Sequence, residues 1–142
     1  MRIRSGIVGL SIAGILFGEG GETKLDFSSL PPAVQKTAKQ QSEGAMVRGY
    51  SKEVEHGKTY YEVELSSGGK DRDVLIDATG SVVEVEQEVE FDALPDAVKA
   101  ELSQRAAGGK ITKVEKVSKG DNVSYEAVVS RDGKKKEITV HP

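Results

Sequence analysis

The stretch "SVVEVEQEVEF", Ser81 to Phe91, decides the fold because it reads both as the end of one structural unit and as the start of another. Apolar residues alternate with polar ones along it, which is the two-residue period of a β-strand with one buried face. We expect one long strand that joins two halves of the chain. Its core side would carry Val83, Val85, Val89 and Phe91, with Gln87 among them, and its other side Glu84, Glu86, Glu88 and Glu90.

The halves on either side of this strand are copies of one another. The segment "LPPAV" at Leu30 recurs as "LPDAV" at Leu94, and the same offset of 64 residues aligns residues 22–78 with residues 86–142 without a gap. Positions that stay apolar in both copies are expected to be buried. This repeat in the sequence therefore predicts that one supersecondary unit occurs twice in tandem.

Each copy predicts a short strand, a helix and then three strands. Proline near the first turn and glycine after the last turn mark the helix, with Gly44 and Gly108 as its stop signals. The buried helix positions would be Leu30, Val34 and Ala38 in one copy and Leu94, Val98 and Leu102 in the other. In the strands, the core positions would be Tyr61, Val63, Leu65, Val74 and Ile76, matched by Tyr125, Ala127, Val129, Ile138 and Val140. The first of the three strands fits no strict two-residue period, which indicates a β-bulge.

These elements predict an α+β fold, a tandem duplicated helix-plus-antiparallel-sheet repeat with the helices on one face of the sheet. We expect residues 21–85 to form the first repeat and residues 86–142 the second, as one compact domain in which the second repeat lacks the last strand. Only the helix-covered face has to be apolar. The glutamate row of the opening stretch would then be a solvated face.

The N-terminal segment has the pattern of a secretory signal peptide. "MRIR" precedes the apolar run "SGIVGLSIAGILFG", which is too short to span a bilayer comfortably. Residues 1–20 are therefore predicted to be removed, with the mature protein periplasmic or secreted. The alternative is that the apolar run forms a buried helix or stays as a membrane anchor.

Composition excludes several kinds of function. The formal net charge of -3 gives no footprint for nucleic acid, which needs clustered Lys and Arg. Cysteine is absent, and the two histidines, His56 and His141, lie in no recognisable motif, so thiol catalysis and Ser-His-Asp chemistry lack support. No basic amphipathic helix remains after signal removal, so we expect no membrane partner. A two-carboxylate enzyme is disfavoured because exposed strand carboxylates have no reason for a raised pKa.

Each unit, a helix opening with Leu-Pro-x-Ala-Val followed by "YYEVEL" or "YEAVV" and by "DVLIDATGSVVEVE", resembles the PepSY-like, beta-lactamase-inhibitor-like domains of bacterial envelope proteins. The resemblance covers residues 22–142. It implies an exported, non-catalytic domain, often in tandem, whose sheet surface holds a protein partner, in some relatives an enzyme being inhibited. Some envelope members are associated with a response to calcium.

Two functions remain open, and both use the face of the sheet turned away from the helices. The first is a protein-binding or inhibitory module whose partner is an envelope or secreted protein, with a basic surface or as an inhibited enzyme. Its contact residues would be Tyr60, Glu62, Glu64, Leu75, Glu84 and Glu86. Tyr60 is the outward-facing aromatic among carboxylates, which suits a basic partner.

The second function is a calcium-responsive domain with a weak carboxylate site. Its ligands would be Asp71, Asp73, Glu84 and Glu86. Like charges on neighbouring strands destabilise a sheet, and calcium would relieve their repulsion. A flat sheet, however, spaces opposite side chains at roughly 4.5 to 5.5 Å, which suits calcium poorly. The alternative is that these carboxylates are solvated or paired with Arg48, Lys52 and Arg72.

Overall fold

The structure is a computed structural model that describes residues 22–142, so the predicted signal peptide lies outside the described residues. The chain divides between Val85 and Glu86 into two compact units. The first unit contains β1 (Glu22–Leu25), the 3-10 helix η1 (Phe27–Ser29), α2 (Pro32–Gln41), β2 (Met46–Glu55), β3 (Lys58–Ser67) and β4 (Lys70–Asp77). Strand β5 (Val82–Glu88) begins in the first unit and ends in the second.

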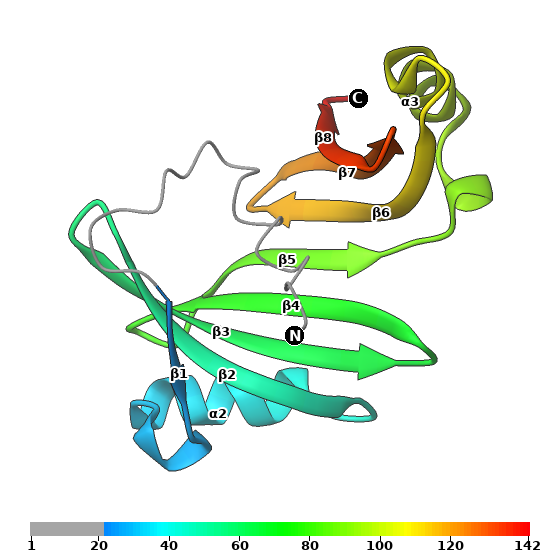
Figure 1. Ribbon diagram of the computed structural model, residues 1–142. Coiled ribbons are helices and arrows are strands. Elements are labelled where there is room, and N and C mark those ends of the chain that lie inside the picture. Colours follow the sequence, from blue (N-terminus) through cyan, green and yellow to red (C-terminus); the bar gives the residue numbers. More distant parts are fainter. Residues whose placement is uncertain (1–21) are drawn as a thin grey trace. The chain divides into compact units, whose positions relative to one another are not determined.

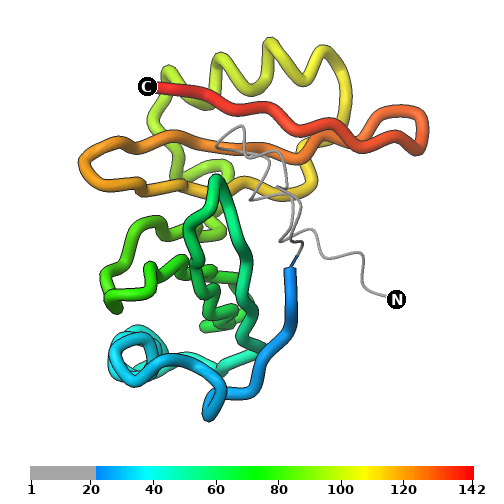
Figure 2. The backbone as a smooth tube through the Cα atoms, turned by 90° about the vertical axis from the view of Figure 1, so that its left-hand side faces the viewer, coloured from blue at the N-terminus to red at the C-terminus, as the bar shows by residue number. Residues whose placement is uncertain are grey.

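The second unit repeats the same order of elements (Figure 1). After β5 come η2 (Phe91–Ala93), α3 (Asp96–Ala106), β6 (Lys110–Lys119), β7 (Asn122–Arg131) and β8 (Lys134–Val140). Figure 2 shows α3 lying along β8, and α3 contacts both β7 and β8. Each unit is thus one helix packed on one face of an antiparallel sheet.

The strands follow one another in sequence order from β1 to β8, and the pairs within each unit are antiparallel. This confirms the predicted α+β class. The predicted bulge is also confirmed, because the register of β2 against β3 shifts between Val47 and Gly49. The second unit has its bulge at the same place in the repeat, between Ile111 and Lys113.

The helices begin and end where local chemistry predicts. Pro31 caps α2 and Pro32 is its first residue, a position where the missing N–H costs no hydrogen bond. Pro95 caps α3 in the same way. Gly44 and Gly108, just beyond the two C-termini, have φ angles of 73° and 85°. Glycine adopts this left-handed conformation without the steric cost that a Cβ brings, so the chain can turn away from each helix just after its C-cap, Ser42 or Ala107.

Each unit has its own apolar core, and the predicted helix positions are all buried. In the first unit Leu30, Val34 and Ala38 pack against strand residues such as Val63 and Ile76. Burying a Leu or Val side chain is worth about 1.5 to 3 kcal/mol. The remaining members of this core are Leu65 and Val74, and the second core contains Leu94, Val98, Leu102, Ala106, Val114, Ala127, Val129, Ile138 and Val140.

The turn between β4 and β5 is fastened to α2. The Thr37 hydroxyl donates a hydrogen bond of 2.5 Å to the backbone oxygen of Gly80. A Cβ at Gly80 would lie 2.7 Å from the backbone oxygen of Ala33, and the φ of Gly80 is 89°. Only glycine fits this approach. The beginning of β5 is therefore held in place by the helix of its own unit.

The segment from Ser81 to Phe91 forms a shorter strand than predicted. Strand β5 ends at Glu88, and Phe91 begins the 3-10 helix η2. Of the side chains expected to face the core, Val85 packs on the first core, and Val89 and Phe91 pack on the second. Alternation alone did not reveal the end of the strand, because Val89 and Phe91 continue the apolar pattern beyond Glu88.

Candidate protein-binding face

In the first unit, the face of the sheet turned away from α2 collects most of the predicted contact residues. Residues directly opposite each other in an antiparallel pair lie on the same face. Glu62 stands opposite Leu75. Glu64 stands opposite Asp73, and Tyr60 opposite Asp77. We call this surface the acidic face; it comprises Tyr60, Glu62, Glu64, Asp71, Asp73 and Leu75 from β3 and β4, Ser51 and Glu53 from β2, Glu22 from β1 and Glu84 from β5.

The expectation of a solvated glutamate row is wrong for its first two members, Glu84 and Glu86, and Glu62 and Leu75 on the acidic face are buried too. Glu62 is 5% exposed, Glu84 is 3% exposed and Leu75 is buried as well. Glu86, which belongs to the second unit, is 7% exposed. Toward the end of the row, Glu88 is half-buried and Glu90 is exposed.

Curvature explains the burial in the first unit. Strands β2 and β5 are not neighbours in the sheet, yet the charge of Glu84 on β5 acts on Glu53 of β2. Such closeness requires strands β2 to β5 to curve around the acidic face, as twisted antiparallel sheets do. The prediction assumed a flat sheet, which would have left these side chains in water.

Glu53 is a buried carboxylate whose protonation the acidic face changes. It is 6% exposed, and its Oε1 atom has no hydrogen-bond partner. Burial raises the pKa of Glu53 from 4.5 to about 7, and the charges of Glu22, Glu55 and Glu84 add to the rise. Burial disfavours the charged form, and neighbouring like charges do the same. Glu53 therefore changes protonation state near neutral pH.

Tyr60 lies at one end of the acidic face beside a hollow of about 360 Å³. The hollow is also lined by Lys58 and Thr59 of β3, by Val83 of β5, and by Asp77, Ala78 and Thr79 from the turn after β4. Tyr60 is half-buried, which leaves part of its ring accessible. In the turn, Asp77 Oδ1 accepts hydrogen bonds from the Thr79 hydroxyl at 2.6 Å and from the Ser81 amide at 3.0 Å. The hollow thus has a rigid polar wall.

The residues proposed as calcium ligands are not gathered into one site. Asp71 forms an ion pair of 2.6 Å with Arg48, one of the pairings considered from the sequence. Asp73 is half-buried opposite Glu64. Glu84 and Glu86 lie on either side of the division between the units. Across residues 22–142, no three His, Cys, Asp or Glu side chains form a group that could hold a metal ion.

The second unit places different groups at the equivalent positions. Its buried Glu115 pairs with the Lys113 ammonium at 2.8 Å. Its buried Glu126 accepts a hydrogen bond of 3.4 Å from the Thr139 hydroxyl. With the offset of 64 residues, Lys113 corresponds to Gly49 and Val117 corresponds to Glu53. The first unit therefore differs from the second in having a buried carboxylate at position 53 and in having no lysine at position 49.

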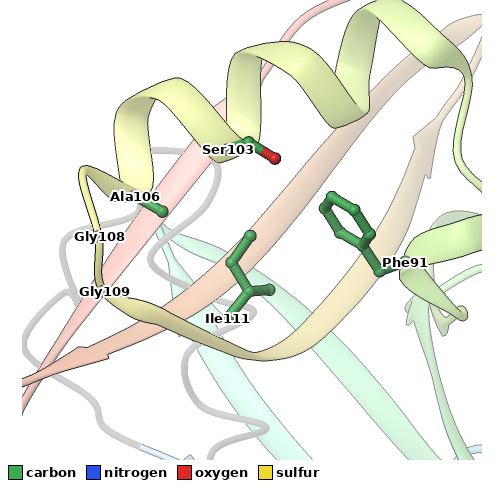
Figure 3. A pocket seen from close by; sticks show the side chains of 6 residues that line it. All are labelled: Phe91, Ser103, Ala106, Gly108, Gly109 and Ile111. Atoms are coloured by element: carbon green, nitrogen blue, oxygen red, sulfur yellow. The ribbon is translucent and has the colours of Figure 1, made fainter.

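The second unit also has a hollow of about 480 Å³ on its helix side (Figure 3). Phe91 and Ile111 point toward the underside of α3 there, and Ser103 and Ala106 line it from the helix. Gly108 and Gly109 form its end. These residues offer no titratable group, so the hollow has no acid or base for catalysis.

Sequence reasoning missed Glu53 and Ser51, which both belong to the acidic face. The bulge between Val47 and Gly49 shifts the register, so alternation counted from the start of β2 assigns the wrong face. A signal was present in the repeat itself. Where the first copy has Glu53, the second has an apolar residue, which marks a buried position that carries a charge in one copy only.

The fold and this face define a small helix-plus-sheet module repeated in tandem. The family described as "Putative beta-lactamase-inhibitor-like, PepSY-like" matches residues 19–83 and 59–140. The chain belongs to this family, as its sequence motifs predicted.

Solved structures share the fold. A "putative periplasmic" protein of Bacteroides eggerthii is 19% identical, with a TM-score of 0.65 over 79% of this chain and 81% of that one. A protein of Bacteroides ovatus is 22% identical, with a TM-score of 0.61 over 80% of this chain and 81% of the other. A BLIP-like protein of Bacteroides fragilis is 17% identical, with a TM-score of 0.55 over 80% and 88% of the two chains. No curated protein matches the sequence.

Proposed function

We propose that the chain is an exported, non-catalytic module that binds a protein partner on the acidic face of its first unit. The observation that carries this proposal is the contrast between the two faces of that sheet. One face is closed by α2 and an apolar core. The other concentrates carboxylates next to an accessible tyrosine and a hollow. Charge of one sign beside an aromatic anchor suits a partner with a basic surface.

Family membership supports a binding role. The family description refers to inhibitor-like proteins, and inhibitors act by binding. The proposal is that the module binds a protein. Inhibition is the special case in which that protein is an enzyme. The residues that gather on the acidic face form no arrangement of nucleophile and base, and the family match indicates no catalytic class.

Export rests on two observations. The sequence begins with the signal-like segment described above, and one of the similar structures is a "putative periplasmic" protein. Within residues 22–142 the structure has no helix long and apolar enough to cross a membrane. The partner would accordingly be an envelope or secreted protein.

Affinity capture from the envelope tests the proposal. The bait would be the wild-type chain, a Tyr60→Ala variant and a Lys36→Ala variant, whose change lies at an exposed position of α2. Proteins captured by wild type and by Lys36→Ala, and lost with Tyr60→Ala, would be partners of the acidic face. If both variants captured the same proteins as wild type, Tyr60 would have no part in binding.

A further inference from the structure

We propose that Glu53, with Glu22 and Glu84 beside it, is the binding site for an arginine side chain of the protein partner. This inference rests on the proposed function and deepens it, because it names the group that the acidic face recognises. It concerns a residue that the sequence did not single out. Three observations carry it: the state of Glu53, the charges around it, and the comparison of the two units.

Glu53 is a buried acceptor with unused hydrogen-bonding capacity. The side chain is 6% exposed, and its Oε1 atom has no hydrogen-bond partner. A buried polar atom without a partner lowers stability, because it has lost its water without a replacement. A donor supplied from outside the chain would restore that hydrogen bond.

The charges around Glu53 are mostly negative. Glu22 stands directly opposite it on the edge strand β1, Glu55 follows it on β2, and Glu84 acts on it from β5. The titratable groups that face it from every neighbouring strand are Glu22 and Lys24 of β1, Glu55 of β2, Lys58, Tyr60 and Glu62 of β3, Asp77 of β4 and Glu84 of β5. Lys24 and Lys58 are the cations among them, and both are exposed. The site therefore favours a positively charged ligand.

The duplicated unit shows that the fold does not need a carboxylate here. At the equivalent position Val117 is buried, opposite Ser124 as Glu53 is opposite Tyr60. The second unit also supplies its own cation, because Lys113 pairs with Glu115. In the first unit the position of that lysine is Gly49. The position of Glu115 is Ser51, so the whole pair is replaced, and the buried carboxylate of β2 lies at Glu53 instead.

A guanidinium fits this arrangement better than a metal ion. Calcium needs six to eight converging oxygens, and the part of the chain that the structure describes contains no group of three suitable side chains. A guanidinium is flat, carries five donors and binds one or two carboxylates through paired hydrogen bonds. Glu22 is half-buried on the four-residue edge strand β1, so an arginine would reach Glu53 across that edge.

The test uses Nα-acetyl-argininamide as the probe, with the citrulline analogue as its uncharged isostere, titrated into the isotopically labelled full chain. We expect the arginine probe to shift the carboxyl resonances of Glu53, Glu22 and Glu84, with a Glu53→Gln variant binding at least about tenfold more weakly. Glu101→Gln, which removes an equal charge from an exposed position of α3, should bind like wild type. Binding should also weaken as the pH falls below 7, because Glu53 then takes up a proton.

Equal binding of the citrulline probe, equal binding by Glu53→Gln, or shifts confined to other residues would overturn the proposal. If Glu53→Gln does not fold, the wild type alone decides, because saturation with the arginine probe must lower the pKa of Glu53. An unchanged pKa at saturation would overturn it too. If the arginine site at Glu53 is disproved, the expected result of the capture experiment with Tyr60→Ala does not change. The two proposals can therefore fail separately.

Discussion

Replacing Glu53 by glutamine should stabilise the protein at neutral and alkaline pH. In the folded chain burial and the neighbouring carboxylates raise the pKa of Glu53 to about 7, whereas an unfolded glutamate has a pKa of 4.5. Between these two values the folded state keeps a proton that the unfolded state has lost. The free energy of unfolding of the wild type therefore falls as the pH rises from 4.5 to 7, by about 3 kcal/mol at about 1.4 kcal/mol per pH unit.

Thermal unfolding of wild type and Glu53→Gln between pH 4.5 and 8 measures this effect. The two melting temperatures should agree near pH 4.5, and the variant should melt about 10 °C higher at pH 8. The control is Glu101→Gln, which makes the same chemical change at a half-exposed position of α3. A difference between Glu53→Gln and wild type that stays constant over this range would show instead that Glu53 titrates as an ordinary glutamate.

Four further predictions concern the core, the turns and the metal hypothesis. Leu102→Ala should cost about 2 to 5 kcal/mol in urea unfolding, because it opens a cavity in a fully buried position. Gly80→Ala should cost more than Gly57→Ala; both glycines have positive φ, but only at Gly80 would the new methyl meet the backbone of α2, so equal losses would contradict the packing. Hydrogen bonds from the Thr79 hydroxyl and, to a smaller extent, from the Ser81 amide lower the pKa of Asp77, so the ionised Asp77 stabilises the fold above pH 3.8 and loses this effect as the pH falls further. In urea unfolding, Asp77→Asn should therefore make the loss of stability in acid less steep, and an equally steep loss would contradict this role of Asp77. Millimolar calcium should raise the melting temperature no more than magnesium does, since Asp71 is already paired with Arg48, and a calcium-specific rise lost in Glu84→Gln would instead support the calcium site.

The repeat and the core could be predicted because both depend on local patterns. Leu30, Val34 and Ala38 recur at helical spacing and are buried. Duplication strengthened this prediction, since the second copy keeps apolar residues at the same positions. Helix ends followed in the same way, because proline and glycine act through the conformation of a single residue.

The burial of the acidic face could not be predicted, because it depends on how strands distant in the sequence curve toward one another. Alternation assigned Glu62 and Glu84 to the correct side of the sheet and left them in water. Curvature brings Glu84 close enough to act on Glu53, although many residues of chain separate them. Glu53 itself was missed because the bulge at Val47 and Gly49 changes which side of β2 it occupies.

The raised pKa of Glu53 follows from the same curvature. The sequence gives exposed strand carboxylates no reason for a raised pKa, and a two-carboxylate enzyme was disfavoured for that reason. The structure changes the premise for Glu53, which is buried among other carboxylates. In the proposal above, the altered protonation of Glu53 serves the binding of a cationic group.

Site-specific photo-cross-linking in the envelope shows directly whether the acidic face contacts another protein. A photo-reactive phenylalanine derivative would replace Tyr60 on the acidic face or, as the control, Lys36 on the exposed side of α2. We expect a protein adduct from position 60 and none from position 36. Adducts from position 36 alone, or none from either position, would contradict the claim that the acidic face binds a protein partner.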